Sequence, residues 1–365
     1  MGESIMGQPK KQTLHFAFGP VQDFVSQARR TRDLWAGSYL LSWLAGHAMS
    51  ALKDKGGEVI MPKVDNDPLF QQIRSPKTLT LKDQASYLGS LPNRFTVRVP
   101  DGVDGTVCTE AIYANWQRVT AAVHNFIKDE LSSNGAEIWQ RQTAPDNLWE
   151  CTWVIGEAGY LLNHRKDFRI HFPRPEPGAK CTLCGEREEL SDQRKRPEMN
   201  KWWQDLIDSI QRKHSEKIHG LDLKDNERLC AVCLTKRLFP HVAKQAIGWQ
   251  VPEFYPSTLY MSAVDWIIHV LKLAKENDGV RLVAEQFLDT VQDRIVRYAE
   301  KQTWDKIAGI KELIESCPEL TKLKKIQYVD GAVFYQDALQ RKDLHLSNPR
   351  QVAAALSTLQ NTVEK

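Results

Sequence analysis

The sequence lacks any long apolar segment. No run approaches the roughly 20 apolar residues that span a bilayer, and the opening residues MGESIMGQPKKQ lack the apolar stretch of a signal peptide. The sequence therefore predicts a protein without a membrane partner. Seven cysteines are an odd number, which together with the missing signal peptide predicts a reducing, cytoplasmic location.

An excess of one charge is also missing. The chain has 49 Lys and Arg against 46 Asp and Glu, a formal net charge of +3. This near balance does not indicate a dominant field for nucleic acid, although local basic runs are present. With 365 residues, of which 42% are hydrophobic, the chain is long enough for two or three domains, each with its own core.

Two Cys-x-x-Cys motifs are the clearest chemical feature. Cys181 and Cys184 lie in CTLCGE, and Cys230 and Cys233 lie in LCAVCL. Four thiolates bind one tetrahedral Zn²⁺ at about 2.3 Å and close its coordination shell, so we predict a structural zinc site. The 45 residues between the motifs exceed the roughly 15–20 of a compact zinc ribbon, which predicts an inserted segment.

Other interpretations of these cysteines are a redox-active motif, a disulfide framework, or coincidence. A redox motif normally occurs once, at the start of a helix beside a strand, so two similar copies favour a shared metal site. The remaining cysteines, Cys108, Cys151 and Cys317, lie apart in the sequence and are predicted to be small core residues.

The N-terminal half predicts an α+β fold of the ferredoxin-like type. Strands are expected where short apolar patterns occur, and long helices where apolar residues follow helical spacing. Gly37-Ser38 is expected to interrupt or bend the first helix. Strand, helix, strand, strand, helix, strand is the order of a split βαβ unit. The segments, in order, are Gln12–Phe18, Val21–Lys55, Glu58–Pro62, Arg94–Val99, Glu110–Leu131 and Glu150–Ile155.

Three regions follow from these patterns. The ferredoxin-like domain is predicted over residues 12–172, a zinc-binding insertion over 173–240, and a mainly helical region over 241–365. The first boundary lies at the Pro- and Gly-rich PRPEPGAK segment, Pro173–Lys180. The helical region is predicted from amphipathic patterns at Ser262–Glu276, Gly279–Glu300 and Gln351–Glu364.

Several short motifs carry a family resemblance. The segment from Phe18 to Leu44 contains GPVQ, at Gly19–Gln22, followed by RRTRDLWAGS, at Arg29–Ser38. It resembles the first palm-like domain of the large signature subunit of type III CRISPR effector complexes, particularly the Cmr type. LPNRF, HRKDFR, CTLCGE, LCAVCLTKR and FYPST are similar to that family's landmarks and come in its order. The resemblance runs from about residue 12 to residue 340.

The resemblance implies a function. A complete subunit of this family has two palm domains with a zinc module between them, and the palms polymerise ATP into cyclic oligoadenylate when target RNA is bound. Many members also carry a metal-dependent nuclease domain. This sequence contains neither the His-Asp dipeptide of that nuclease nor the Gly-Gly-Asp-Asp of the second palm. Carboxylates are needed to hold the divalent ions of phosphoryl transfer, so we predict no catalytic residues and no turnover by this chain alone.

The resemblance also raises the prospect of a nucleotide half-site. The turn after the first strand, with Gly19, Val21, Gln22 and Asp23, offers backbone amides to a triphosphate of ATP with Mg²⁺, completed by a second palm. A plain strand-to-helix turn is the alternative.

Basic residues are candidates for contact with RNA or a partner protein. They are Arg29, Arg30, Arg32, Arg165, Lys166 and Arg169, with Lys236-Arg237 as a further pair that clamps an RNA backbone. The alternative is a solvated surface, on which Asp23 and Asp33 act as counter-charges.

The sequence thus predicts the front half of a Cmr-type large subunit, acting as a scaffold. Its partners would be the other effector subunits, especially the one that grips the 5′ end of the guide RNA, and through them the guide and target RNA. The alternatives are a stand-alone zinc-dependent nucleic-acid-binding or regulatory protein with an inactive palm, and an independent nucleotidyltransferase, which the missing carboxylate pair disfavours.

Overall fold

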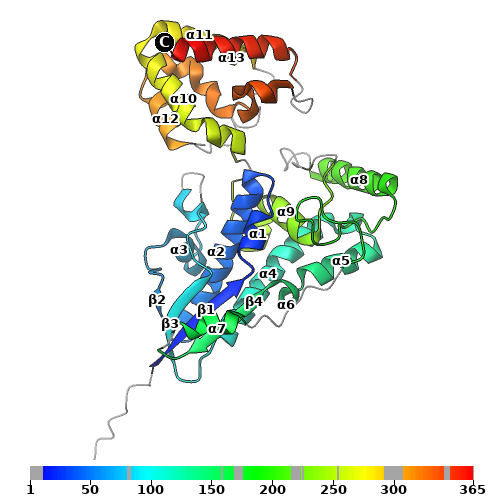
Figure 1. Cartoon of the computed structure of the whole chain (residues 1–365). Helices are drawn as coiled ribbons and strands as arrows, with labels where there is room; N and C mark the ends of the chain where they lie inside the picture. Colours follow the sequence, from blue (N-terminus) through cyan, green and yellow to red (C-terminus); the bar gives the residue numbers. More distant parts are fainter. Residues whose placement is uncertain are drawn as a thin grey trace, which may run out of the picture. The chain divides into compact units, whose positions relative to one another are not determined.

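The chain divides into two compact units, Met1–Glu253 and Phe254–Lys365, in a computed structural model (Figure 1). The structure describes residues 11–79, 84–157, 159–167, 176–214, 223, 226–252, 255–291, 307–340 and 346–364.

A four-stranded antiparallel sheet forms the base of the first unit. Its strands have the order β2-β3-β1-β4, and each lies where the sequence predicted a strand. Register places Phe16 opposite both Phe95 and Trp153, so alternate aromatic residues share one face. Leu14, Phe16 and Phe18 are at most 1% exposed, which makes β1 the buried centre of the sheet. The strands are β1 (Lys11–Gly19), β2 (Glu58–Met61), β3 (Arg94–Pro100) and β4 (Glu150–Ile155).

Two helices replace the single helix predicted after the first strand. These are α1 (Gln22–Ser26) and α2 (Thr31–Asp54), and Arg30 between them is extended, with φ −126° and ψ 149°. The predicted interruption at Gly37-Ser38 is wrong, because both residues lie inside α2. Gly37 serves a different purpose: a Cβ there would lie 3.3 Å from the carbonyl oxygen of Phe24, so the glycine allows α1 to approach α2.

The core of this unit is rich in tryptophan. Trp116, on α4 (Thr106–Ile127), packs edge to face on Trp149 with ring centroids 5.3 Å apart. Phe24 of α1 packs on the same Trp149 ring at 4.9 Å, so the short helix is tied to the start of β4. Trp43 and Trp203 are both 0% exposed, so they are also core residues.

The cysteine-containing segments share this core. Figure 1 shows α9 beside α4, and α9 also contacts α2. One continuous cluster of buried side chains joins Phe16 of the sheet to Trp203 and Cys233. The cysteine segments therefore pack into the same core as the sheet, and their description as a zinc module at 173–240 stays a prediction. The further elements of this unit are α3 (Pro68–Arg74), η1 (Gln84–Tyr87), η2 (Lys128–Glu130), α5 (Ser133–Thr143), α6 (Pro145–Leu148), α7 (Leu161–Asp167), α8 (Arg196–His214) and α9 (Ala231–Ile247).

The second unit is built from helices. Val270, Phe287 and Phe334 contribute to its own core, and the Tyr260 hydroxyl donates a hydrogen bond to the carbonyl of Ile326 at 3.1 Å. Its elements are α10 (Thr258–Glu276), α11 (Asp278–Thr290), α12 (Ala308–Glu315), η4 (Pro318–Tyr328), η5 (Gly331–Phe334), η6 (Gln336–Gln340) and α13 (Pro349–Val363). Among the helices in the described ranges, none combines the length and apolar character needed to cross a bilayer.

Candidate metal centre

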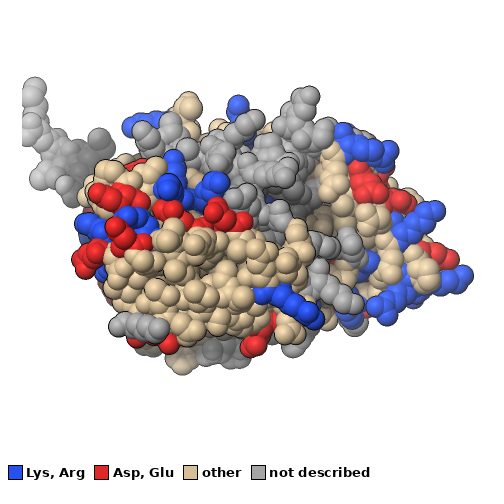
Figure 2. All heavy atoms as spheres, turned by 90° about the horizontal axis from the view of Figure 1, so that it is seen from above, with Lys and Arg blue, Asp and Glu red and all other residues tan. Residues whose placement is uncertain are grey.

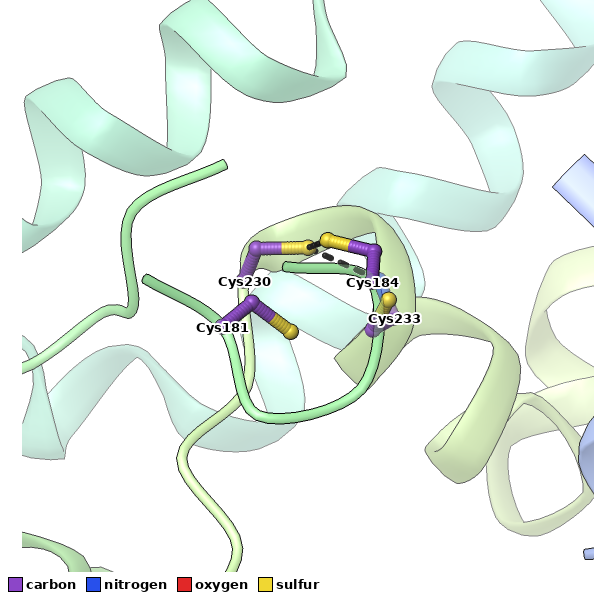
Figure 3. Close-up of side chains that lie close together, drawn as sticks. All are labelled: Cys181, Cys184, Cys230 and Cys233. Atoms are coloured by element: carbon purple, nitrogen blue, oxygen red, sulfur yellow. Dashed lines mark hydrogen bonds between the residues drawn. The ribbon is translucent and has the colours of Figure 1, made fainter. Parts of the chain in front are cut away.

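The four cysteines of the two Cys-x-x-Cys motifs converge at one place. Their sulfur atoms all lie within 4.8 Å of one another, and Cys184 Sγ is 3.8 Å from Cys230 Sγ (Figure 3). Cys181, Cys230 and Cys233 are buried and Cys184 is half-buried. The structure therefore brings together the four residues that the sequence predicted as metal ligands.

Local backbone geometry aims the sulfurs inward. Gly185, at φ +71°, closes a turn in which its amide donates to the carbonyl of Cys181 at 2.9 Å. The amide of Leu183 donates to Cys181 Sγ at 3.4 Å. In the second motif, Cys230 precedes α9 and its sulfur accepts from the amide of Cys233 at 3.4 Å. Amide donors and the start of a helix both favour thiolates.

The spacing fits a tetrahedral metal. Four sulfurs at about 2.3 Å from a central Zn²⁺ lie about 3.8 Å apart, which agrees with the 3.8 Å between Cys184 Sγ and Cys230 Sγ. A disulfide would need about 2.05 Å between sulfurs, and all seven cysteines are free. The four cysteines can bind one metal ion with a closed, structural coordination shell.

The four thiols influence one another's protonation. Burial raises the pKa of the Cys230 thiol, and hydrogen bonding, chiefly with Cys181, raises the pKa of Cys233 and lowers that of Cys184. Adjacent thiolates repel one another, so a single deprotonated thiol suppresses the ionisation of its neighbours. A divalent cation removes this repulsion, and the cluster then supplies four thiolates.

Two cations lie near the cysteines. Burial opposes the charge of Arg187, but the sulfurs of Cys230 and Cys184 raise its pKa overall. Burial lowers the pKa of Lys236, and the sulfur of Cys233 opposes that shift. A Zn²⁺ ion with four thiolates would carry a charge of −2, which these two side chains match.

Lys236 and Arg237 are buried within the protein. Both are 0% exposed, on α9 directly after the second motif. Lys236 Nζ donates to the carbonyl oxygens of Phe24, at 2.6 Å, and Gln27, at 2.5 Å. Their predicted role as an RNA clamp is therefore wrong, because a backbone phosphate has no access to them.

Arg237 forms a buried network of ion pairs. Its Nε and Nη2 atoms donate to the two carboxylate oxygens of Asp33 at 2.6 and 2.8 Å, and its Nη1 donates to Glu227 Oε2 at 2.8 Å. These hydrogen bonds raise the pKa of Arg237 although burial acts against its charge. Asp33 is 0% exposed, so the interpretation of Asp33 as a solvated counter-charge is also wrong.

The predicted nucleotide turn lies at the end of β1. Gly19 ends the strand, Val21 precedes α1, and Gln22 and Asp23 are exposed at the start of that helix. Asn93, from the LPNRF motif, makes two hydrogen bonds to Phe18, the residue before Gly19. Its Nδ2 donates to the carbonyl of Phe18 at 2.6 Å, and its carbonyl accepts from the Phe18 amide at 3.2 Å. Nucleotide binding at this turn stays a prediction.

The arginines among the predicted contact residues that the structure describes differ in exposure. Arg29 is exposed, Arg30 is half-buried with a nitrogen 3.9 Å from Glu227, and Arg32 is only 3% exposed. Arg165 is exposed on α7, where its Nη1 donates to the carbonyl of Trp153 at 2.7 Å.

Lys166 also belongs to α7, and Arg169 lies outside the described residues. In Figure 2, acidic and basic side chains lie next to one another in groups, and a broad area of other residues lies between the groups.

The chain is similar in sequence to known CRISPR-associated proteins. Residues 13–132 match the family model for the N-terminal part of CRISPR-associated protein Cmr2. The chain is also 43% identical, over 368 aligned positions, to the CRISPR system Cmr subunit Cmr2 of Pyrococcus furiosus. That alignment covers 85% of this chain and 40% of the relative, so the chain spans about two fifths of the relative's length. Both matches support the resemblance to a Cmr-type large subunit.

Solved structures show lower similarity. A chain of the type III-B Cmr-beta complex in the apo state has a TM-score of 0.47 and 15% identity, covering 73% of this chain and 37% of that one. A chain of the same complex bound to cognate target RNA has a TM-score of 0.45 and 14% identity, covering 80% and 39%.

We expect the cysteine cluster to bind one metal ion per chain. Replacing Cys181 and Cys230 by Ser removes a thiolate from each motif, so zinc content should fall from about one equivalent to near zero. Elemental analysis of the purified protein measures this. Cys317→Ser, in the second unit, is the matched control and should leave the zinc content unchanged. Full zinc in the double variant would contradict a shared site.

We expect Arg237→Met to be strongly destabilising. The substitution leaves Asp33 and Glu227 buried without their guanidinium partner, which should lower the free energy of unfolding by about 3–5 kcal/mol. Urea denaturation followed by tryptophan fluorescence measures it. The control is Arg98→Met, which breaks the exposed Arg98–Glu58 pair and should cost no more than about 1 kcal/mol. Equal, small effects of both substitutions would contradict the buried network.

Proposed function

We propose that this chain is the front part of the large subunit of a Cmr-type CRISPR effector complex. The observation that carries the proposal is the 43% identity to a Cmr2 subunit across 85% of the chain. Five short motifs in the family's order and the match of residues 13–132 to the Cmr2 N-terminal model support it.

The first unit acts as a ferredoxin-like palm in this proposal. Its sheet order β2-β3-β1-β4, with every neighbouring pair antiparallel, is the arrangement of a split βαβ fold. Residues 12–172 would form the palm, 173–240 a zinc-stabilised insertion, and 241–365 the helical region that leads to a second palm. Structural zinc fits the spacing of the four sulfurs.

The palm presents half of an ATP site. The turn from Gly19 to Asp23 is the candidate, because it is held by Asn93 on the strand side and its residues Gln22 and Asp23 are exposed. The second palm would supply the metal-binding carboxylates, since the sequence contains no Gly-Gly-Asp-Asp. In this role the chain is a scaffold that presents one half of the ATP site and has no turnover of its own.

Assembly with the other effector subunits tests this function. We expect the chain to co-purify with a tagged neighbouring Cmr subunit when it is co-expressed with the remaining subunits and guide RNA, because a scaffold of this kind needs that interface. Size-exclusion chromatography of the purified material measures it. The control is the same co-expression without this chain. If the other subunits assemble while this chain elutes alone, the proposal is contradicted and a stand-alone regulatory protein becomes the better account.

We expect ATP to bind only when the second palm is present. Calorimetry with ATP and Mg²⁺ should show no binding to the chain alone and clear binding after addition of a separately expressed second palm. Gln22→Pro removes one amide donor from the turn and should weaken that binding by roughly tenfold or more. Unchanged affinity in this variant would contradict the turn as the phosphate site, and no binding with both palms would contradict the half-site.

A further inference from the structure

Cys233 and the two buried cations of α9 are one helical turn apart. Cys230 caps the start of the helix, Cys233 lies in its first turn, and Lys236 and Arg237 follow three and four positions later. Residues three and four positions apart lie on neighbouring parts of a helix face. Whatever fixes the cysteines therefore also fixes the direction in which these cations point.

Lys236 acts on the end of α1. The carbonyl oxygens that it contacts, from Phe24 and Gln27, belong to the last turn of α1 and the residue that caps it. A cation is favourable at this end of a helix, and a helix of five residues is marginal without tertiary support. Gly37 lies beside the lysine, because a Cβ there would be in van der Waals contact with Lys236 Cδ at 3.5 Å.

Arg237 acts on the start of α2. Asp33 lies in the first turn of that helix, and its Oδ2 atom accepts hydrogen bonds from Arg237 Nη2 at 2.8 Å and from the amide of Arg29 at 3.4 Å. Lys236 and Arg237 thus hold the two sides of the break between α1 and α2. We call the residues from Gln22 to Asp33 the α1–α2 junction.

We propose that the metal centre controls the conformation of the α1–α2 junction through α9. With metal bound, the four thiolates fix the first turn of α9, and Lys236 and Arg237 reach the junction. Without metal, the first turn of α9 is released, and the junction loses the donors that hold its carbonyls and its Asp33 carboxylate. Lys236 is a positioning residue in this mechanism, which holds whether or not the adjoining turn binds a nucleotide.

Hydrogen exchange on the full chain tests the coupling. Removing the metal from the wild-type protein with a chelator should raise amide exchange in the cysteine segments and also in the α1–α2 junction. Exchange in β1, β3 and the second unit serves as the internal reference for an intact fold. Faster exchange that stays confined to the cysteine segments would overturn the proposal.

Lys236→Met tests the contact with the junction without removing the metal. This variant should keep its zinc, yet exchange at the amides of Val25 and Gln27 should rise by roughly tenfold or more, because two buried carbonyls lose a charged donor. Lys244→Met, at an exposed position of the same helix, is the matched control and should behave like the wild type. Exchange in the junction that is unchanged by Lys236→Met would overturn the proposal, even if metal removal unfolds the chain.

Discussion

The burial of the Arg237 guanidinium is the constraint on which the first unit depends. A buried charge is tolerated only when its partners are in place, and here they come from two distant segments, Asp33 on α2 and Glu227 before α9. The three side chains can be satisfied only if α9 lies against α2. Cys230 lies between Glu227 and Arg237 in the sequence, so the packing of α9 against α2 also fixes its position.

The cysteine cluster adds a second constraint on the same helix. Four thiols within 4.8 Å need a cation to ionise together, and the resulting negative charge is matched by Arg187 and Lys236. The cysteine cluster, the buried cations and the break between α1 and α2 therefore form one connected set. This connection explains why the cysteine segments share a core with the sheet instead of folding apart from it.

The sequence predicted those parts of the fold that local patterns determine. Short apolar patterns located the four strands, and the spacing of the cysteines located the metal ligands. The break between α1 and α2 was misplaced, because Gly37 was interpreted as a helix breaker while its role is to admit α1. The functions of Lys236 and Arg237 were also missed. Their spacing from Cys233 on a helix was a usable signal, but Asp33 and Glu227 pair with Arg237 through tertiary contacts that one sequence does not reveal.

A double-mutant cycle between Arg237 and Asp33 tests the central claim most directly. The free energies of unfolding of Arg237→Met, Asp33→Leu and the double variant would be measured against the wild type. The account predicts strong non-additivity, with the double variant recovering about 2 kcal/mol or more of the summed single losses. Additive losses, within about 0.5 kcal/mol, would contradict the claim that this buried ion pair fixes α9 to α2.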